Sequence, residues 1–125
     1  MIAEKSSPKS GENVWLWLFK ILSGVVLVVI LGIHLVVNHL IGSNGLLTWQ
    51  DVVSYYSHPI VPFLESLFII LVVPHSLIGL RGIFLDLHPS RGLLTAINWL
   101  FSLVGAVAIV YGVWLISVLA SQPHP

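Results

Sequence analysis

Three long apolar stretches decide what this chain can fold into. They run from about 14 to 41, from 59 to 86 and from 93 to 120, and each exceeds the roughly 20 helical residues that cross a bilayer core. Inside lipid the backbone must satisfy its own hydrogen bonds, so each stretch is predicted to be an α-helix. Only 8% of the residues are charged, too few to cover the surface of a soluble domain. We therefore predict an all-α integral membrane protein with three transmembrane helices.

Polar segments flank the single transmembrane domain, which we place at 14–121. Residues 1–13 form a polar tail, and residues 122–125 form a short tail at the other end. The sequence Ser43-Asn44-Gly45 breaks the chain after the first span, and His88-Pro89-Ser90 breaks it after the second. The segment 42–58 is accordingly predicted to be a loop.

The basic residues give the orientation in the membrane. All of them lie before the first span, near its start, or around the connection between the second and third spans, and segment 42–58 and the C-terminal tail have none. By the positive-inside rule the N-terminus is cytoplasmic and the C-terminus lies outside. The zero net charge gives no reason to expect a nucleic-acid partner, and the absence of cysteine excludes disulfides, iron–sulfur ligation and covalent haem attachment within this chain. The basic residues are Lys5, Lys9, Lys20, Arg81 and Arg91.

Histidines inside the spans are the candidate functional residues, because an ionisable side chain in lipid points to function. In the second span, His75, Gly79, Gly82 and Asp86 are spaced 4, 3 and 4 residues apart and share one helix face. The two glycines leave room beside the imidazole for a flat cofactor, although small residues at this spacing also serve helix packing. Spacing alone leaves three roles open for these histidines: a haem ligand, a proton relay or a structural contact.

His34 in the first span lies on the same face as Ser23, and His39, nearer the outer end, is its rival as a ligand. His34 is about 20 residues past Val14, or roughly 30 Å up at ~1.5 Å per residue. His75 is about 11 residues from the inner end of its span, or roughly 16 Å up. If the two histidines are haem ligands, this difference in depth predicts two haems, each with a second ligand from another chain, because the third span has no histidine.

The second span reads His75-Ser-Leu-Ile-Gly79-Leu-Arg81-Gly-Ile-Phe-Leu-Asp86. It resembles the H-x3-G-x-R-x4-D signature of the cytochrome b membrane-anchor subunits of succinate dehydrogenase and fumarate reductase. The Ser23-Gly24 pair followed by His34 is similar to the pattern in the first span of bacterial anchors of this family. The resemblance covers about residues 15–118.

This resemblance implies an anchor subunit of a succinate:quinone oxidoreductase (respiratory complex II) in a bacterial or archaeal cytoplasmic membrane. Its partners would be a flavoprotein subunit, an iron–sulfur subunit, membrane lipid and a second membrane-anchor subunit that completes a haem-binding helix bundle. The cofactors implied are haem b, two per complex, with His34 and His75 as axial ligands, and a quinone, either menaquinone or ubiquinone. The anchor passes electrons to quinone and is not an enzyme alone, so no residue of this chain is predicted to be catalytic.

The resemblance is incomplete at the quinone site. Many relatives have an arginine two residues before the Ser-Gly pair and a tyrosine after the aspartate, where this chain has Ile21 and Leu87. Either the partner chain supplies the quinone site, or Lys20, Ser23 and Asp86 form a variant of it.

Several further residues keep alternative interpretations. Gly79 and Gly82 would pack against haem, and Arg81 would pair with a haem propionate, with Asp86 or with lipid headgroups. Glu65 either serves an outer proton path, pairs with a polar residue of a neighbouring helix or reaches the membrane interface. A stripe of small residues in the third span, at Gly105, Ala108 and Gly112, predicts helix packing.

Two alternatives remain for the chain as a whole. The first is the anchor of a quinol:fumarate reductase. The second is a small membrane protein of transport or assembly without haem, in which histidines hold helices together.

Overall fold

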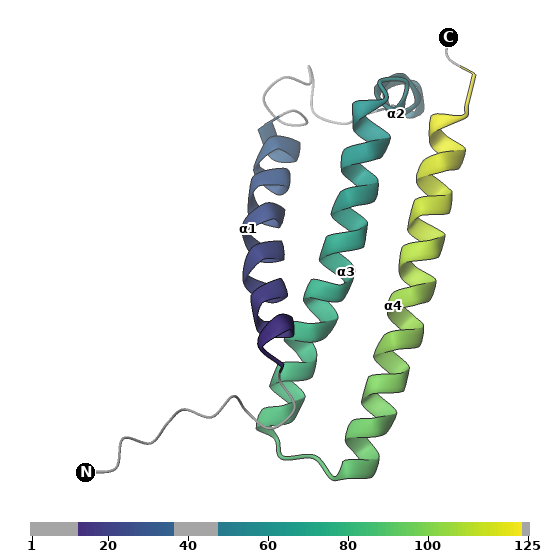
Figure 1. Ribbon diagram of the computed structural model, residues 1–125. Coiled ribbons are helices and arrows are strands. Elements are labelled where there is room, and N and C mark those ends of the chain that lie inside the picture. Colours follow the sequence, from purple (N-terminus) through teal and green to yellow (C-terminus); the bar gives the residue numbers. More distant parts are fainter. Residues whose placement is uncertain (1–12, 37–47, 124–125) are drawn as a thin grey trace.

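The computed structural model describes residues 13–36 and 48–123. Three long helices stand side by side, with consecutive ones antiparallel, and a short helix lies at one end (Figure 1). Each long helix is long and apolar enough to cross a membrane, and the described residues contain no strand. This confirms the predicted all-α membrane protein with three spans. The helices are α1 (Val14–Val36), α2 (Trp49–Tyr56), α3 (Ile60–Asp86) and α4 (Arg91–Ala120).

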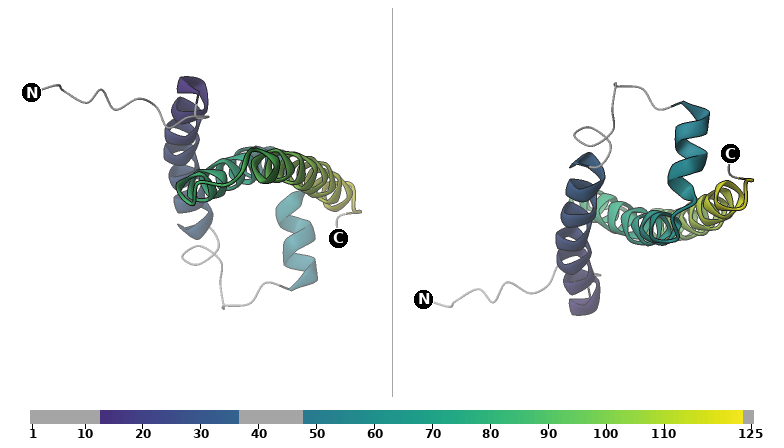
Figure 2. Two further views of the ribbon diagram at one scale, coloured as in Figure 1. Left: turned by 90° about the horizontal axis from the view of Figure 1, so that it is seen from below. Right: turned by 90° about the horizontal axis from the view of Figure 1, so that it is seen from above.

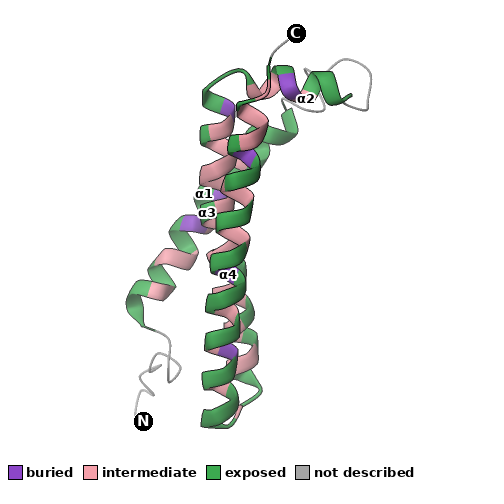
Figure 3. Cartoon of the chain, turned by 90° about the vertical axis from the view of Figure 1, so that its right-hand side faces the viewer, coloured by how far each residue is buried: buried purple, intermediate pink, exposed green. Residues whose placement is uncertain are grey.

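Helix α3 is the centre of the structure, because it packs against α1 on one side and against α4 on the other. The described parts of α1 and α4 make no backbone contact with each other, and α1 is tilted across α3 (Figure 2). Few side chains are buried, and most large apolar side chains of the three spans remain exposed (Figure 3). Only lipid or another membrane helix can cover such a surface. The buried residues of the described part of the chain are Ser23, Leu27, Val53, Val61, Ile97, Gly105 and Ile116.

Local hydrogen bonds and one backbone conformation fix the helix ends on the side where α1 begins. The Asn13 side chain accepts a hydrogen bond from the Trp15 N–H at 3.2 Å. The Ser90 side chain accepts one from the Leu93 N–H at 3.3 Å, so α4 begins at Arg91, two residues before the predicted start of the third span. After α3, His88 adopts a left-handed φ of 53°, which ends the helix before Pro89. The predicted end of the first span at residue 41 lies outside the described residues.

Helix α2 corrects the prediction that 42–58 is a loop. The Thr48 hydroxyl accepts from the Asp51 N–H at 3.3 Å, and an Asp51 carboxylate oxygen accepts from the Thr48 N–H at 2.8 Å. This capping box satisfies two backbone donors at the helix start, which is how so short a helix forms. The interpretation missed it because it followed only stretches long enough to span the bilayer.

Glycines let α4 approach α3 closely, as the small-residue stripe predicts. A Cβ added at Gly105 would lie 2.9 Å from Leu77 Cδ1, and one added at Gly112 would lie 2.8 Å from Ile69 Cδ1. Both positions therefore serve packing between the second and third spans.

Candidate functional site

Two polar contacts join α1 to α3, and each includes one of the predicted histidines. Near the middle of the spans, Ser23 Oγ lies 2.9 Å from His75 Nδ1. Near the last turn of α1 and the first turns of α3, His34 Nδ1 lies 3.2 Å from Glu65 Oε1. Because the helices are antiparallel, both pairs fit one register, and each helix provides the histidine of one pair and its partner in the other. Glu65 thus pairs with a polar residue of a neighbouring helix, one of its three predicted roles.

The Ser23–His75 pair, called the inner pair from here on, is closely packed. Ser23 is only 3% exposed, and its hydroxyl also donates to the Phe19 carbonyl oxygen at 2.5 Å. The next residue, Gly24, faces the imidazole, since an added Cβ there would lie 3.2 Å from His75 Cε1. A larger residue at this position would displace the His75 ring or α1 itself.

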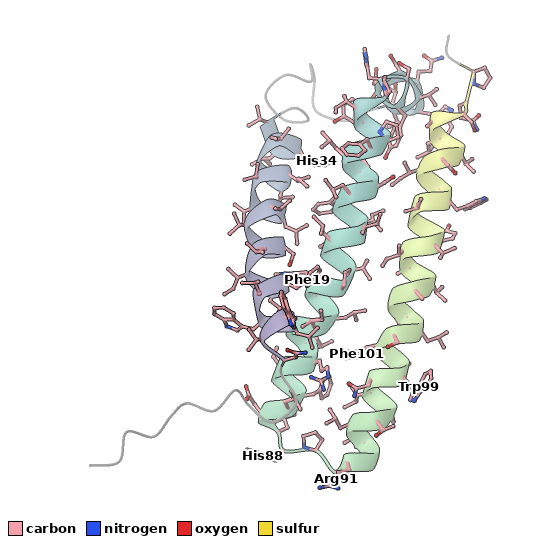
Figure 4. All side chains as sticks on the ribbon, in the orientation of Figure 1. Phe19, His34, His88, Arg91, Trp99 and Phe101 are labelled. Carbon is pink, nitrogen blue, oxygen red and sulfur yellow. The ribbon has the colours of Figure 1, made fainter. Side chains whose placement is uncertain are left out.

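The His34–Glu65 pair, called the outer pair from here on, is more open. The His34 side chain is 47% exposed and that of Glu65 is 22% exposed. Both line a cavity of about 100 Å³ together with Tyr55 of α2 and apolar side chains of α1 and α3. His34 lies near the end of α1 that is closer to α2 (Figure 4). The sequence signal for this pair was present, because Glu65 is a lone carboxylate inside an apolar stretch.

Tyrosines of α2 respond to the same carboxylate. Partial burial raises the pKa of Tyr55 above its ordinary value, and the charge of Glu65 raises it further. Burial likewise makes the largest contribution to a raised pKa of Tyr56. The charges of Glu65 and of ionised Tyr55 raise this pKa further, by smaller amounts. The charge of Glu65 in the outer pair therefore acts on the tyrosines of α2, a helix that lies outside the membrane spans.

The structure keeps the two histidines at different depths. His75 and Glu65, the partner of His34, are ten residues apart on α3, or roughly 15 Å along the helix axis. Within the described residues, no three histidine or acidic side chains come together as a metal site. Any metal bound in the spans would therefore meet these histidines singly.

Gly79 and Gly82 lie on the His75 stripe and face open space. No atom of the described chain comes within 4 Å of a Cβ added at either position. Unlike Gly105 and Gly112 of α4, they pack against no other helix within the described residues. They leave room beside α3 for another molecule.

Arg81 makes a contact that the sequence interpretation did not consider. Its Nε donates to Asn98 Oδ1 of α4 at 2.7 Å. Both residues line an open groove of about 440 Å³ between α3, α4 and the start of α1. Asn98 carried no pattern of its own in the sequence, since its partner lies on another helix. The groove also includes Leu16, Pro74, Phe101, Ser102 and Gly105.

The residues predicted to bind quinone lie at separate levels. Lys20 is partly buried one turn before Ser23, whereas Asp86 is exposed at the last residue of α3. Asp86 is eleven residues from His75, the contact of Ser23, and so lies roughly 16 Å closer to the inner end. One quinone ring could not touch Ser23 and Asp86 together. His39, the rival of His34, lies outside the described residues.

Comparisons with known proteins point to one family. Residues 5–113 match the family described as succinate dehydrogenase/fumarate reductase transmembrane subunit. The chain is also 27% identical over 115 residues to the succinate dehydrogenase hydrophobic membrane anchor subunit of Archaeoglobus fulgidus, with 92% of this chain and 97% of that relative covered. No solved structure gives a significant match. Both histidine pairs and the Arg81–Asn98 contact lie within the matched region.

Proposed function

Because the chain belongs to the family of succinate dehydrogenase/fumarate reductase transmembrane subunits, we propose that it is the haem b-binding anchor of a succinate:quinone oxidoreductase. It is a multi-pass protein of the cytoplasmic membrane and associates, as a membrane anchor, with the catalytic subunits of its complex. In the proposal, electrons from the flavoprotein and iron–sulfur subunits pass to membrane quinone by way of this anchor. The observation that carries the proposal is that two histidines inside the spans, His34 and His75, each contact a polar side chain of the other helix through Nδ1.

The surroundings of both histidines fit haem. Nδ1 of each imidazole contacts a polar side chain of the other helix, which leaves Nε2 for an iron, and imidazole is a common axial ligand. Beside His75, Gly79 and Gly82 leave the space that a flat macrocycle needs. Bound haem b would supply one-electron redox chemistry at its iron. The role of this chain would be to hold the imidazoles at two depths, so that each serves a different haem.

The proposal includes a second membrane-anchor subunit. The third span has no histidine, so further axial ligands would come from another chain. The many exposed apolar side chains of the three spans give such a chain a surface to pack against. The two anchors together would form the haem-binding bundle.

Quinone reduction belongs to the proposal as well, on the cytoplasmic side where the iron–sulfur subunit would dock. Lys20 with Ser23 on α1, and Asp86 at the end of α3, remain as two separate sequence-based candidates, and the Arg81–Asn98 groove is a third. Because Asn98 Oδ1 accepts from Arg81, its amide N–H groups remain as donors for a quinone carbonyl. A photoreactive quinone analogue tests this, since labelling of α4 favours the groove and labelling confined to α1 or to the end of α3 favours the sequence-based candidates.

A competing role for the histidines has support in the same contacts. Hydrogen bonds between membrane helices stabilise their packing, so both pairs could serve structure alone. This is the alternative in which the chain carries no haem. The anchor of a quinol:fumarate reductase differs only in the direction of electron flow, and the matched family includes both enzymes.

One experiment separates these possibilities. We expect the reduced-minus-oxidised spectrum of the purified complex to show two b-type haem signals, of which His75→Ala abolishes one and His34→Ala the other. His58→Ala is the matched control, because His58 is exposed outside the spans, and it should keep both signals. A correctly assembled complex with no haem band would overturn the proposal and favour the purely structural role.

A further inference from the structure

Ser23 is the one buried polar side chain among the described residues. A polar group in the membrane interior is costly unless its hydrogen-bonding capacity is satisfied. The Ser23 hydroxyl has its closest contacts with the Phe19 carbonyl oxygen, at 2.5 Å, and with His75 Nδ1, at 2.9 Å. A weaker contact of 3.3 Å reaches the Lys20 carbonyl oxygen.

The position of each proton follows from counting donors. A serine hydroxyl has one hydrogen, and a carbonyl oxygen can only accept. A contact of 2.5 Å between Ser23 Oγ and the Phe19 carbonyl oxygen requires that hydrogen to lie between them. Ser23 therefore presents a lone pair to His75, and the hydrogen of the 2.9 Å contact must come from Nδ1 of the imidazole. A neutral imidazole with its proton on Nδ1 has its free lone pair on Nε2.

We propose that Ser23 is a positioning residue that holds His75 in the tautomer whose Nε2 can bind iron. The inference rests on the proposed haem function and adds a residue to it. Hydrogen-bond partners of this kind fix the tautomer and the ring orientation of a metal-binding histidine. Gly24 completes the arrangement. Because it has no side chain, the His75 ring can lie close enough to α1 for its Nδ1 to reach Ser23.

The structure thus gives Ser23 a different role from the predicted one in quinone binding. Its hydroxyl proton is directed at the backbone of its own helix, and its oxygen is directed at His75. The Ser-Gly pair works as a unit in which one residue orients the imidazole and the next makes room for it.

The first test reads the tautomer directly and needs no haem. The full chain with ¹⁵N-labelled histidine is reconstituted in lipid nanodiscs, and the His75 ring signals are assigned by their loss in His75→Ala. We expect nitrogen NMR to show a protonated Nδ1 and an unprotonated Nε2 in the wild type, and a loss of this preference in Ser23→Ala. A wild-type His75 protonated on Nε2 would overturn the inference.

The second test measures haem retention in the assembled complex. Ser23→Ala should weaken binding of the His75 haem by ~10- to 100-fold, the usual effect of removing such a partner, and leave the His34 haem in place. Ser23→Thr keeps a hydroxyl and should restore most of the binding. Ser117→Ala is the matched control, because Ser117 is an exposed serine whose hydroxyl bonds to its own helix backbone.

The two readouts fail separately. A Ser23→Ala complex with unchanged tautomer and unchanged haem retention overturns the positioning role while the haem proposal stands. A wild-type complex without haem overturns the proposed function, whichever tautomer His75 adopts.

Discussion

The inner and outer histidine pairs are built from the same two helices but differ in the charge, packing and exposure of the histidine's partner. The inner partner, Ser23, is neutral, small and 3% exposed, whereas the outer partner, Glu65, can carry charge and is 22% exposed. The inner imidazole lies against Gly24, whereas the outer one borders a cavity of about 100 Å³. The contact near the middle of the spans thus has a fixed geometry, and the contact at the end of the spans nearest α2 has a more adaptable one.

This difference shows how a pair of membrane helices can hold two similar side chains for different purposes. A neutral partner in a packed contact fixes orientation and excludes water. A carboxyl group beside a cavity adds electrostatic influence that reaches α2, where the pKa values of Tyr55 and Tyr56 respond to it. The predictions below test whether the tight packing of the inner pair and the openness of the outer pair are separate properties.

The largest effect is expected from filling the space beside the inner imidazole. In Gly24→Leu the new side chain would start 3.2 Å from His75 Cε1, so the ring or α1 must move. Overpacking of this kind costs roughly 1–3 kcal/mol, and the His75 haem signal of the complex should be lost. The free energy of unfolding of the reconstituted chain and the haem spectrum of the complex measure the two effects.

Gly32→Leu is the matched control for that variant. It makes the same substitution on the same helix, but no described atom lies within 4 Å of a Cβ at Gly32. The reconstituted chain should therefore keep its stability. Equal destabilisation by both variants would show that the inner pair is not specially constrained.

A smaller effect separates the partners themselves. Ser23→Ala leaves the Nδ1–H of a packed imidazole without its acceptor and should cost roughly 1–2 kcal/mol of unfolding free energy. Glu65→Gln changes a partly exposed pair and should cost less than about 0.5 kcal/mol. Denaturant titration of the two reconstituted variants checks the order. The reverse order would mean that the outer pair is the main tie between α1 and α3.

The capping box of Thr48 and Asp51 is expected to stabilise α2 without affecting the inner pair. Thr48→Ala removes the hydroxyl that accepts from the Asp51 N–H and should destabilise α2 by about 1 kcal/mol. Hydrogen exchange of the α2 amides should become faster while that of α3 near His75 stays unchanged. Gln50→Ala, an exposed change in the same turn, is the control, and faster exchange around His75 in Thr48→Ala would contradict the separation.

The same cap predicts an acid dependence. Hydrogen bonds from the Thr48 side chain and backbone hold the pKa of Asp51 below its ordinary 3.8. A lowered pKa means that the carboxylate stabilises the folded helix above pH 3.8 and that this contribution disappears as the pH falls through the pKa of the folded state. The protection factors of the α2 amides, which correct exchange for its intrinsic pH dependence, should therefore fall in this acid range, and Asp51→Asn should remove the transition.

Sequence reasoning found the spans, the two histidines and the packing glycines because each leaves a mark along a single helix. The apolar length gives the span, the spacing of Gly105 and Gly112 gives a helix face, and depth follows from the rise per residue. Contacts between helices leave no such mark. That Ser23 faces His75 and that Arg81 reaches Asn98 depends on how each helix is rotated and tilted in the bundle. The short helix α2 was within reach, since the spacing of Thr48 and Asp51 is that of a capping box.

The smallest expected effect reports the electrostatic reach of the outer pair. Burial and the charge of Glu65 both raise the pKa values of Tyr55 and Tyr56, so Glu65→Gln should lower both values while burial keeps them above 10.0. A raised tyrosine pKa stabilises the fold below pH 10.0, and this contribution is lost as the pH rises through the folded value, so the variant should lose it at lower pH. Ultraviolet titration of the phenolates measures the shift. Asp51→Asn removes an equal charge from α2 that does not act on these tyrosines, so an equal shift in that control would mean that net charge, rather than the outer pair, sets the tyrosine pKa values.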